Sequence, residues 1–175
     1  MISSRHIKRI KKELELFTKD KKPNIQLQKH IPDDFDKNHF KLIDYTSDII
    51  IFEVYLMNTK SSNPANNLTV KFRYTHNYPF TAPTLTVNGE GYINTIGAMS
   101  DKLPEIGRDP HDCMCCSSFT CPNNWGPFLS IVALLSEVRH NFIDIRRIND
   151  RITARKFVED VFGKGLVRLP IAEYI

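Results

Sequence analysis

The chain has 175 residues, of which 41% are hydrophobic and 25% are charged. This balance is typical of a globular domain and excludes a disordered or collagen-like chain. The net charge of +4 comes from 24 basic and 20 acidic residues, which are too evenly mixed to form the basic stripe of a nucleic-acid binder. At this length we expect one domain, residues 1–165, followed by a short C-terminal tail at 166–175.

The first residues and the cysteines predict a cellular compartment. Residues 1–6 lead into a charged helix where a secretory leader would have an apolar core, and no apolar run is long enough to cross a bilayer. All the cysteines lie close together, whereas a secreted disulfide scaffold spreads them along the chain. They are Cys113, Cys115, Cys116 and Cys121. We therefore expect free thiols in a reducing intracellular compartment, the cytoplasm or the nucleus, and no membrane partner.

The first half of the chain predicts one helix followed by strands. Apolar residues recur at helical spacing among charged ones, which predicts an amphipathic helix that ends before Pro23. These apolar residues are Ile7, Ile10, Leu14 and Phe17. Stretches rich in β-branched and aromatic residues then predict strands at 25–28, 40–45, 49–57, 68–75 and 84–87. Over 68–75 apolar and polar residues alternate strictly, which indicates a strand with one buried face.

The second half predicts a long loop and then helices. Residues 88–124 show no sustained periodicity and are predicted to be mostly loop. One helix is predicted to begin at 125–127, where a proline suits the first turn. Another is predicted to begin at a cap supplied by Asn149 or Asp150 and to end at Gly163. Because strands precede helices instead of alternating with them, the predicted fold class is α+β.

Four local motifs accompany this order of elements. They are the basic helix 7–14, the turn Tyr78-Pro79-Phe80-Thr81-Ala82-Pro83, the segment Tyr92-Ile93-Asn94 and the tripeptide Trp125-Gly126-Pro127. Together they resemble the catalytic domain of ubiquitin-conjugating enzymes over about residues 5–140. Glycine stands where the family's Trp-Ser-Pro segment has serine. The histidine and proline of the family's Tyr-His-Pro-Asn motif are missing.

The resemblance implies a fold and an activity. The implied fold has an N-terminal helix, a four-stranded antiparallel meander, an active-site loop and C-terminal helices. The implied enzyme receives ubiquitin, or a ubiquitin-like modifier, from an activating enzyme as a cysteine thioester and passes it to a target lysine, usually with a ubiquitin ligase. Cysteine suits this relay because a thiolate is both a strong nucleophile and a good leaving group. No cofactor is needed at this step, since the activating enzyme spends the ATP, and we expect a monomer.

The choice of nucleophile depends on the flanking residues. In the family the nucleophilic cysteine lies between two apolar residues, and a third apolar residue follows four positions later. Met114, Cys116 and Phe119 supply this pattern for Cys115, which is the first candidate. Cys116 is the next candidate because its spacing to the tryptophan is nearer to that of the family. Cys113 is the third.

Asn94 matches the family's asparagine, whose amide stabilises the developing oxyanion or holds the active-site loop. A turn asparagine without a catalytic role is the alternative. Because the neighbouring histidine and proline are absent, backbone amides, Asn123 or Asn124 could support the oxyanion instead.

Two sets of residues match the partner-binding surface of the family. The set on the two ligase-facing loops comprises Phe80, Pro127 and Phe128. The set on the first helix comprises Lys8, Arg9 and Lys12. The alternatives are core packing for the aromatic residues and a solvated face for the basic ones.

Three other functions compete with this one. A structural zinc site could use the cysteines and His111, but the adjacent Cys115 and Cys116 can hardly both bind one ion without strain, so we expect no metal. A catalytically inactive member of the same fold would bind the modifier or the ligase as a scaffold, although such variants typically lack the cysteine. A cysteine hydrolase would need His76, His111 or His140 as a base, and no local signature supports it.

Overall fold

The computed structural model describes the sheet, the helices that follow it and part of the N-terminal helix. The described residues are Arg5, 7–10, 12–13, 35–45, 49–58, Asn63, 66–106, Asp109 and 113–163, with the backbone alone for 35–45 and 57–58. The strand predicted at 25–28 and the tail at 166–175 lie outside these residues.

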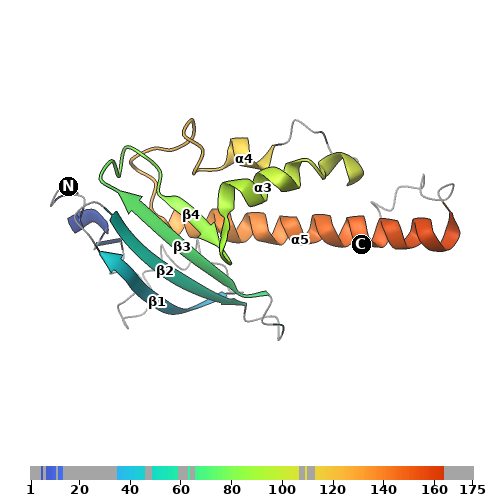
Figure 1. Cartoon of the computed structure of the whole chain (residues 1–175), viewed down its shortest axis with the longest axis horizontal. Coiled ribbons are helices and arrows are strands. Elements are labelled where there is room, and N and C mark those ends of the chain that lie inside the picture. The colour runs from blue at the N-terminus through green and yellow to red at the C-terminus, as the bar shows by residue number, and fades with distance from the viewer. Residues whose placement is uncertain are drawn as a thin grey trace.

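Five consecutive strands form one antiparallel sheet in the order β1-β2-β3-β4-β5 (Figure 1). Their bounds are β1 Phe35–Tyr45, β2 Ile49–Asn58, β3 Leu68–Thr75, β4 Thr84–Val87 and β5 Glu90–Gly91. Strand β1 begins before the predicted position, β2 to β4 lie where they were predicted, and the two-residue β5 was not predicted. The α+β class and the antiparallel meander are confirmed.

The alternation predicted for β3 is also confirmed. Its apolar residues are buried and the residues between them are partly or fully exposed. Phe72 of β3 pairs with Phe52 of β2 across the ladder, and their rings stack with centroids 4.8 Å apart. Tyr74 stacks on the same Phe52 ring at 5.5 Å. Cross-strand aromatic pairs of this kind place the hydrophobic core on one face of the sheet.

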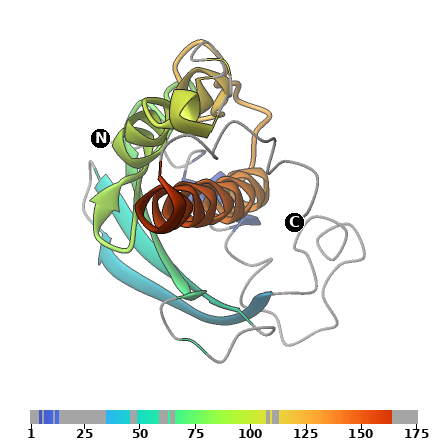
Figure 2. The ribbon, with the colours of Figure 1, turned by 90° about the vertical axis from the view of Figure 1, so that its right-hand side faces the viewer.

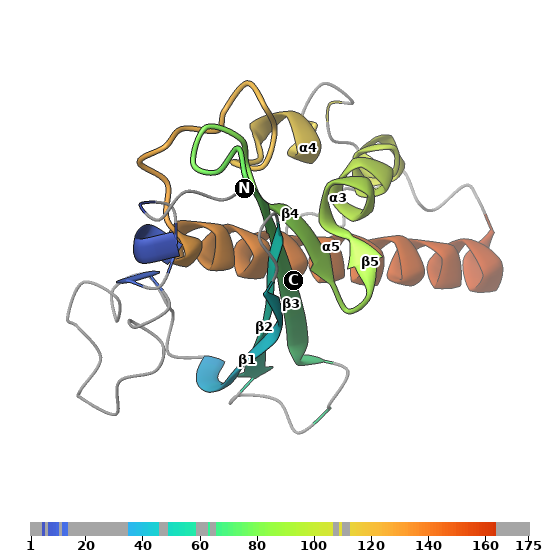
Figure 3. The ribbon, with the colours of Figure 1, turned by 60° about the vertical axis from the view of Figure 1, so that its left-hand side comes forward.

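A single helix, α5 (Ile131–Phe162), crosses the core face of the sheet (Figures 1 and 3). Figure 2 looks along this helix and shows the sheet curving around one side of it. Beyond the sheet, α5 continues past its edge and contacts the 3₁₀ turn η2 (Leu103–Ile106). Among the helices that the structure describes, none combines the length and the apolar character that a bilayer crossing requires.

The prediction of two C-terminal helices is wrong, because α5 is continuous where the second was expected to begin. Asn149 and Asp150 lie exposed in the middle of α5 and cap nothing. Ile145, Ile148 and Ile152 are buried on either side of them. This apolar stripe continues at helical spacing, so tertiary packing overrides the capping preference of asparagine and aspartate.

The helix start predicted at 125–127 is also wrong. The N-cap of α5 is Ser130, whose Oγ accepts a hydrogen bond from the backbone N–H of Ala133 at 3.4 Å. The residues before it form a tight turn, in which the N–H of Leu129 donates to the carbonyl of Gly126 at 2.9 Å. Pro127 occupies the second position of this turn, where its fixed φ is favourable.

Residues 88–124 contain more regular structure than predicted. A two-residue turn with positive φ at Asn88 (51°) and Gly89 (91°) joins β4 to β5, as is typical of an Asn-Gly hairpin. Helix α3 (Tyr92–Ser100) and the single-turn helix α4 (Met114–Ser117) follow. In α3, Tyr92, Ile96 and Met99 are buried at helical spacing, which anchors the helix to the core.

Candidate functional site

Three cysteine thiols gather at the single turn of α4. The sulfur atoms of Cys113, Cys115 and Cys116 all lie within 4.8 Å of one another, and those of Cys115 and Cys116 are 4.0 Å apart. We call these three residues the thiol cluster. Cys113 immediately precedes α4, and because residues three apart share one side of a helical turn, Cys116 comes back beside it. Cys121 is also a free thiol but lies outside the cluster.

Helix α3 packs against the thiol cluster and holds the start of α4 in place. A Cβ placed on Gly97 would lie 4.0 Å from the Cys115 sulfur, so this thiol rests on the α3 backbone. The backbone N–H of Met114 donates to the hydroxyl of Ser100 at 3.0 Å, and that hydroxyl donates to the carbonyl of Ile96 at 3.1 Å. Ser100 is buried. The start of α4 is therefore held on the last turn of α3, while Cys116 remains exposed.

Hydrogen-bond donors converge on Cys113. The thiol of Cys115, and then the backbone N–H and the thiol of Cys116, stabilise a thiolate there and lower the pKa of Cys113 to about 6. Donation to Cys113, together with burial, raises the pKa of Cys115 to about 12. The pKa of Cys116 is also raised, because its proton is held by the hydrogen bond to Cys113. Of the three thiols, Cys113 is therefore the one that ionises most readily.

Two side chains hold the segment that follows the cysteines. Asn124 donates from Nδ2 to the carbonyls of Cys116 at 2.6 Å and Ser118 at 3.1 Å. Glu137 of α5 accepts from the Ser118 hydroxyl at 2.5 Å and from the backbone N–H of Phe119 at 2.7 Å. Ser118 is buried. These hydrogen bonds attach the segment after α4 to α5 and also connect its own residues, so the chain directly after α4 is held in one position.

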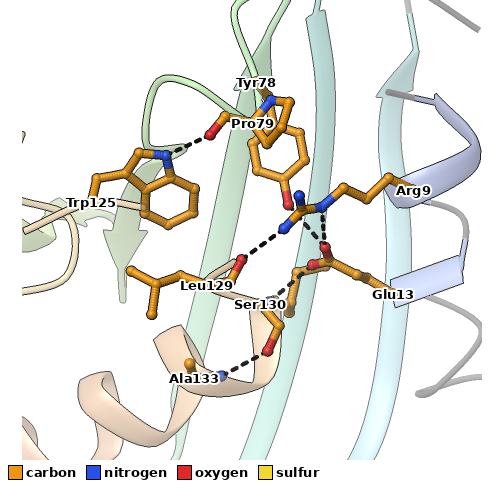
Figure 4. Close-up of polar contacts among 9 residues, drawn as sticks. Arg9, Glu13, Tyr78, Pro79, Trp125, Leu129, Ser130 and Ala133 are labelled. Carbon is orange, nitrogen blue, oxygen red and sulfur yellow. Dashed lines mark hydrogen bonds and ion pairs between the residues drawn. The ribbon is translucent and has the colours of Figure 1, made fainter. Parts of the chain in front are cut away.

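A second polar group joins the N-terminal helix to the start of α5 (Figure 4). Glu13 accepts from Arg9 Nε and from the Tyr78 hydroxyl, both at 2.9 Å, and from the backbone N–H of Ile131 at 3.0 Å. Arg9 also donates to the carbonyl of Leu129 at 3.1 Å. We call these five residues the Glu13 junction. Its carboxylate satisfies a free N–H at the N-terminus of α5, where negative charge is favourable.

The two proline-containing motifs of the sequence are in direct contact (Figure 4). The indole Nε1 of Trp125 donates to the carbonyl of Pro79 at 2.7 Å, and its ring lies 6.1 Å from that of Tyr78. The peptide bond between Tyr78 and Pro79 is cis. A Cβ on Gly126 would overlap the Phe128 ring, so serine at this position would displace that ring. The lack of a side chain at Gly126 is therefore what leaves room for the Phe128 ring.

The predicted partner-binding residues divide into exposed and internal ones. Phe80 and Phe128 are 76% and 84% exposed, so core packing is wrong for both aromatic residues, and Pro127 is also exposed. Lys8 and Lys12 are exposed. Arg9 is engaged within the Glu13 junction, where its guanidinium also lies over the Tyr78 ring at 5.3 Å. Arg9 therefore has a structural role that the sequence did not indicate.

Asn94 lies in the first turn of α3, so its interpretation as a turn asparagine is wrong. Its side chain is exposed, and its Nδ2 approaches Gly91, lying 3.3 Å from where a Cβ on that glycine would be. Gly97 and Ser100, further along the helix, contact the cysteine segment. The catalytic role of Asn94 stays a prediction.

Two of the three candidate histidines, His76 and His140, are among the described residues, and both are exposed on other elements than the cysteines. His140 is exposed on α5, where its Nε2 lies 3.4 Å from the carboxylate of Asp144. His76 is exposed in the segment after β3. His111 lies outside the described residues. The structure therefore gives no support to a cysteine hydrolase with His76 or His140 as its base.

Comparisons with protein-family models, with functionally characterised proteins and with solved structures each found no match. The function must accordingly be inferred from the site. A cluster of accessible thiols, one of which has a lowered pKa, can attack an activated carbonyl or bind a soft metal ion.

Proposed function

We propose that the chain is an enzyme of the ubiquitin-conjugating type, which carries ubiquitin or a ubiquitin-like modifier as a thioester on the thiol cluster. The observation that carries the proposal is the hydrogen bond between Trp125 and Pro79. It joins the two most specific motifs of the resemblance, which are far apart in the sequence. The first motif lies between β3 and β4 of the antiparallel meander, the second follows the meander, and the thiol cluster lies between the two motifs on the chain.

The reaction needs only what the thiol cluster offers. The thiolate attacks the carbonyl carbon of the modifier's C-terminal thioester on the activating enzyme. A new C–S bond forms, and the activating enzyme leaves as a thiolate. In the second step the amine of a target lysine attacks the same carbonyl, loses a proton and releases the cysteine thiolate. A low-pKa sulfur favours both steps, because it is ionised before attack and leaves readily afterwards.

Sequence and geometry favour different members of the cluster as the acyl carrier. The flanking residues favour Cys115, whereas the hydrogen-bond donors favour Cys113. Cys116 is the most accessible of the three. Asn124 holds the loop directly after the cluster and takes the loop-supporting role that the sequence assigned first to Asn94.

The proposal also concerns partners and location. Phe80, Pro127 and Phe128 stand exposed on the two loops that Trp125 joins, and we assign them to contact with a ubiquitin ligase. Exposed aromatic residues cost little stability but provide apolar area for a partner. Free thiols of this kind persist in the reducing cytoplasm or nucleus.

A panel of serine variants tests the proposal. The wild-type chain and the single variants Cys113→Ser, Cys115→Ser, Cys116→Ser and Cys121→Ser are incubated with activating enzyme, ATP and ubiquitin, and each adduct is treated with a thiol reductant. The wild type should form an adduct that the reductant removes. One variant of the cluster should lose that adduct or form a reductant-resistant oxyester, and Cys121→Ser should behave like the wild type. If the wild type forms no adduct, the chain is a binding scaffold instead.

A further inference from the structure

We propose that Cys113, Cys115 and Cys116 together bind one soft d¹⁰ metal ion, Zn²⁺ or Cu⁺, through three thiolates. This inference goes beyond the proposed function and does not depend on it, because it requires only the positions of the sulfur atoms. It also reverses the expectation from the sequence that the cluster binds no metal.

The spacing of the three sulfur atoms matches that of metal ligands. All of them lie within 4.8 Å of one another, and those of Cys115 and Cys116 are 4.0 Å apart. With a Zn–S bond of about 2.3 Å, two sulfur atoms on one tetrahedral ion are separated by roughly 3.8 Å. Small side-chain rotations would therefore bring all three thiols onto one ion. Among the described residues, this is the one group of three metal-binding side chains with such spacing.

The backbone explains why adjacent cysteines can share an ion here. Cys113 and Cys116 have the Cys-x-x-Cys spacing that is common in zinc sites, and the single turn of α4 brings them together. Cys115 supplies a third sulfur atom, which lies next to Gly97 of α3 and within 4.8 Å of the other two. The adjacent Cys115 and Cys116 can both bind one ion here, because their sulfur atoms already lie 4.0 Å apart.

The supporting contacts would hold the ligands in place before the ion arrives. Ser100 fixes the N–H of Met114, and Asn124 fixes the carbonyl of Cys116. Backbone positions on both sides of the cluster are therefore set by α3 and by the loop. Since Cys116 is exposed, an ion can enter from solvent, and a water molecule can complete a tetrahedral Zn²⁺ site. Three thiolates alone satisfy Cu⁺, which prefers soft sulfur ligands.

A metal ion bound to the thiol cluster would block the acyl transfer proposed for the same sulfur atoms. An ion that occupies all three sulfur atoms leaves no thiol of the cluster free to accept an acyl group. Metal binding and modifier transfer would therefore exclude each other. Because the cysteines bind the ion as thiolates, binding displaces thiol protons, and the affinity for the ion should increase with pH.

Metal titration of the reduced full-length chain, freed of metal with a chelator, tests the proposal. Zn²⁺ and Cu⁺ are added in separate experiments against a chromophoric chelator that competes for the ion. We expect one ion per chain in at least one experiment. Each of Cys113→Ser, Cys115→Ser and Cys116→Ser should weaken binding by more than about tenfold, since even residues that only orient a ligand change affinity by roughly that factor.

The matched control is Cys121→Ser, which removes a thiol from the same segment but outside the cluster and should bind like the wild type. Far-UV circular dichroism checks that every variant is folded. X-ray absorption of the loaded chain should show three sulfur neighbours, at about 2.3 Å for zinc. The proposal is overturned if the chain takes neither ion from the chelator, or if single serine variants of the cluster bind the ion like the wild type. It is also overturned if X-ray absorption shows only nitrogen and oxygen neighbours around the ion.

Discussion

At the scale of single residues, Glu137 links three parts of the candidate site. Its carboxylate accepts from the Tyr92 hydroxyl at 2.8 Å, and also from Ser118 and the N–H of Phe119. Tyr92 begins α3, which contacts the thiol cluster through Gly97, and the other two donors follow the cluster on the chain. A glutamate in a helix pattern has no sequence signal for such a role, because its partners are brought to it only by the fold.

We expect Glu137→Gln to destabilise the chain by about 1–3 kcal/mol, because the new amide N–H₂ meets the N–H of Phe119 as a second donor and leaves a polar group unsatisfied. Urea denaturation measures this loss. Glu159→Gln is the control, since Glu159 lies on the same helix and pairs only with Arg155 at 3.0 Å near the surface. Its cost should be about 0–1 kcal/mol. Equal losses in the two variants would contradict the role of Glu137.

Three tyrosines predict how the chain responds to high pH. Burial, reinforced by nearby acidic groups, raises the pKa of Tyr74, Tyr78 and Tyr92 above the ordinary value of 10.0. Above pH 10 the unfolded chain therefore binds fewer protons than the folded chain, and stability falls as pH rises. This contribution is fully present below pH 10.

An alkaline titration followed by tyrosine absorbance and far-UV circular dichroism checks this expectation. Ionisation of the three buried tyrosines should coincide with unfolding and lie above pH 10. If all six tyrosines of the chain ionise in one smooth step near pH 10 while the dichroism is unchanged, the burial of these rings is wrong.

At the scale of elements, patterns that extend over a whole segment could be read from the sequence. The alternation in β3 reports burial residue by residue, and β4 is bounded by turn residues. Helix α3 was missed because its apolar positions are few and are mixed with Asn94 and Gly97, which are poor helix formers. Its stability comes from packing on the core, which the local sequence does not contain.

Continuity of α5 can be tested with proline. Asn149→Pro should cost about 3 kcal/mol or more in urea denaturation, because the ring clashes with the carbonyl of Ile145 and removes a helical hydrogen bond. Asn149→Ala should cost nothing, since the side chain is exposed in mid-helix. The reverse result, a tolerated proline and an alanine that costs about 1 kcal/mol, would indicate a helix cap at this position instead.

At the scale of the whole molecule, the sequence could place motifs in order but not in space. The Glu13 junction joins residues more than a hundred positions apart, and the thiol cluster depends on α3, which was not predicted. Neither arrangement has a local signature. The contact between Trp125 and Pro79 likewise appears only in the folded chain.

Replacing an exposed aromatic residue by alanine should reduce the ligase-stimulated transfer of ubiquitin without reducing the stability of the chain. Phe80→Ala and Phe128→Ala should each change the free energy of unfolding by less than about 0.5 kcal/mol, as is usual for surface positions. Each should slow the ligase-stimulated transfer of ubiquitin to lysine in a single-turnover assay. Phe157→Ala is the control, because Phe157 is similarly exposed (65%) but lies toward the far end of α5. An unchanged rate in Phe80→Ala, or an equal decrease in Phe157→Ala, would contradict the assignment.

The most direct test of the thioester proposal is the intact mass of the chain after incubation with activating enzyme, ATP and ubiquitin. We predict that the wild-type chain and Cys121→Ser gain the mass of one ubiquitin, and that a thiol reductant removes it. A variant with Cys113, Cys115 and Cys116 all changed to serine should gain no reductant-sensitive mass. A wild-type chain that gains no mass, or a triple variant that still carries a reductant-sensitive ubiquitin, would contradict the proposal that the thiol cluster carries the modifier.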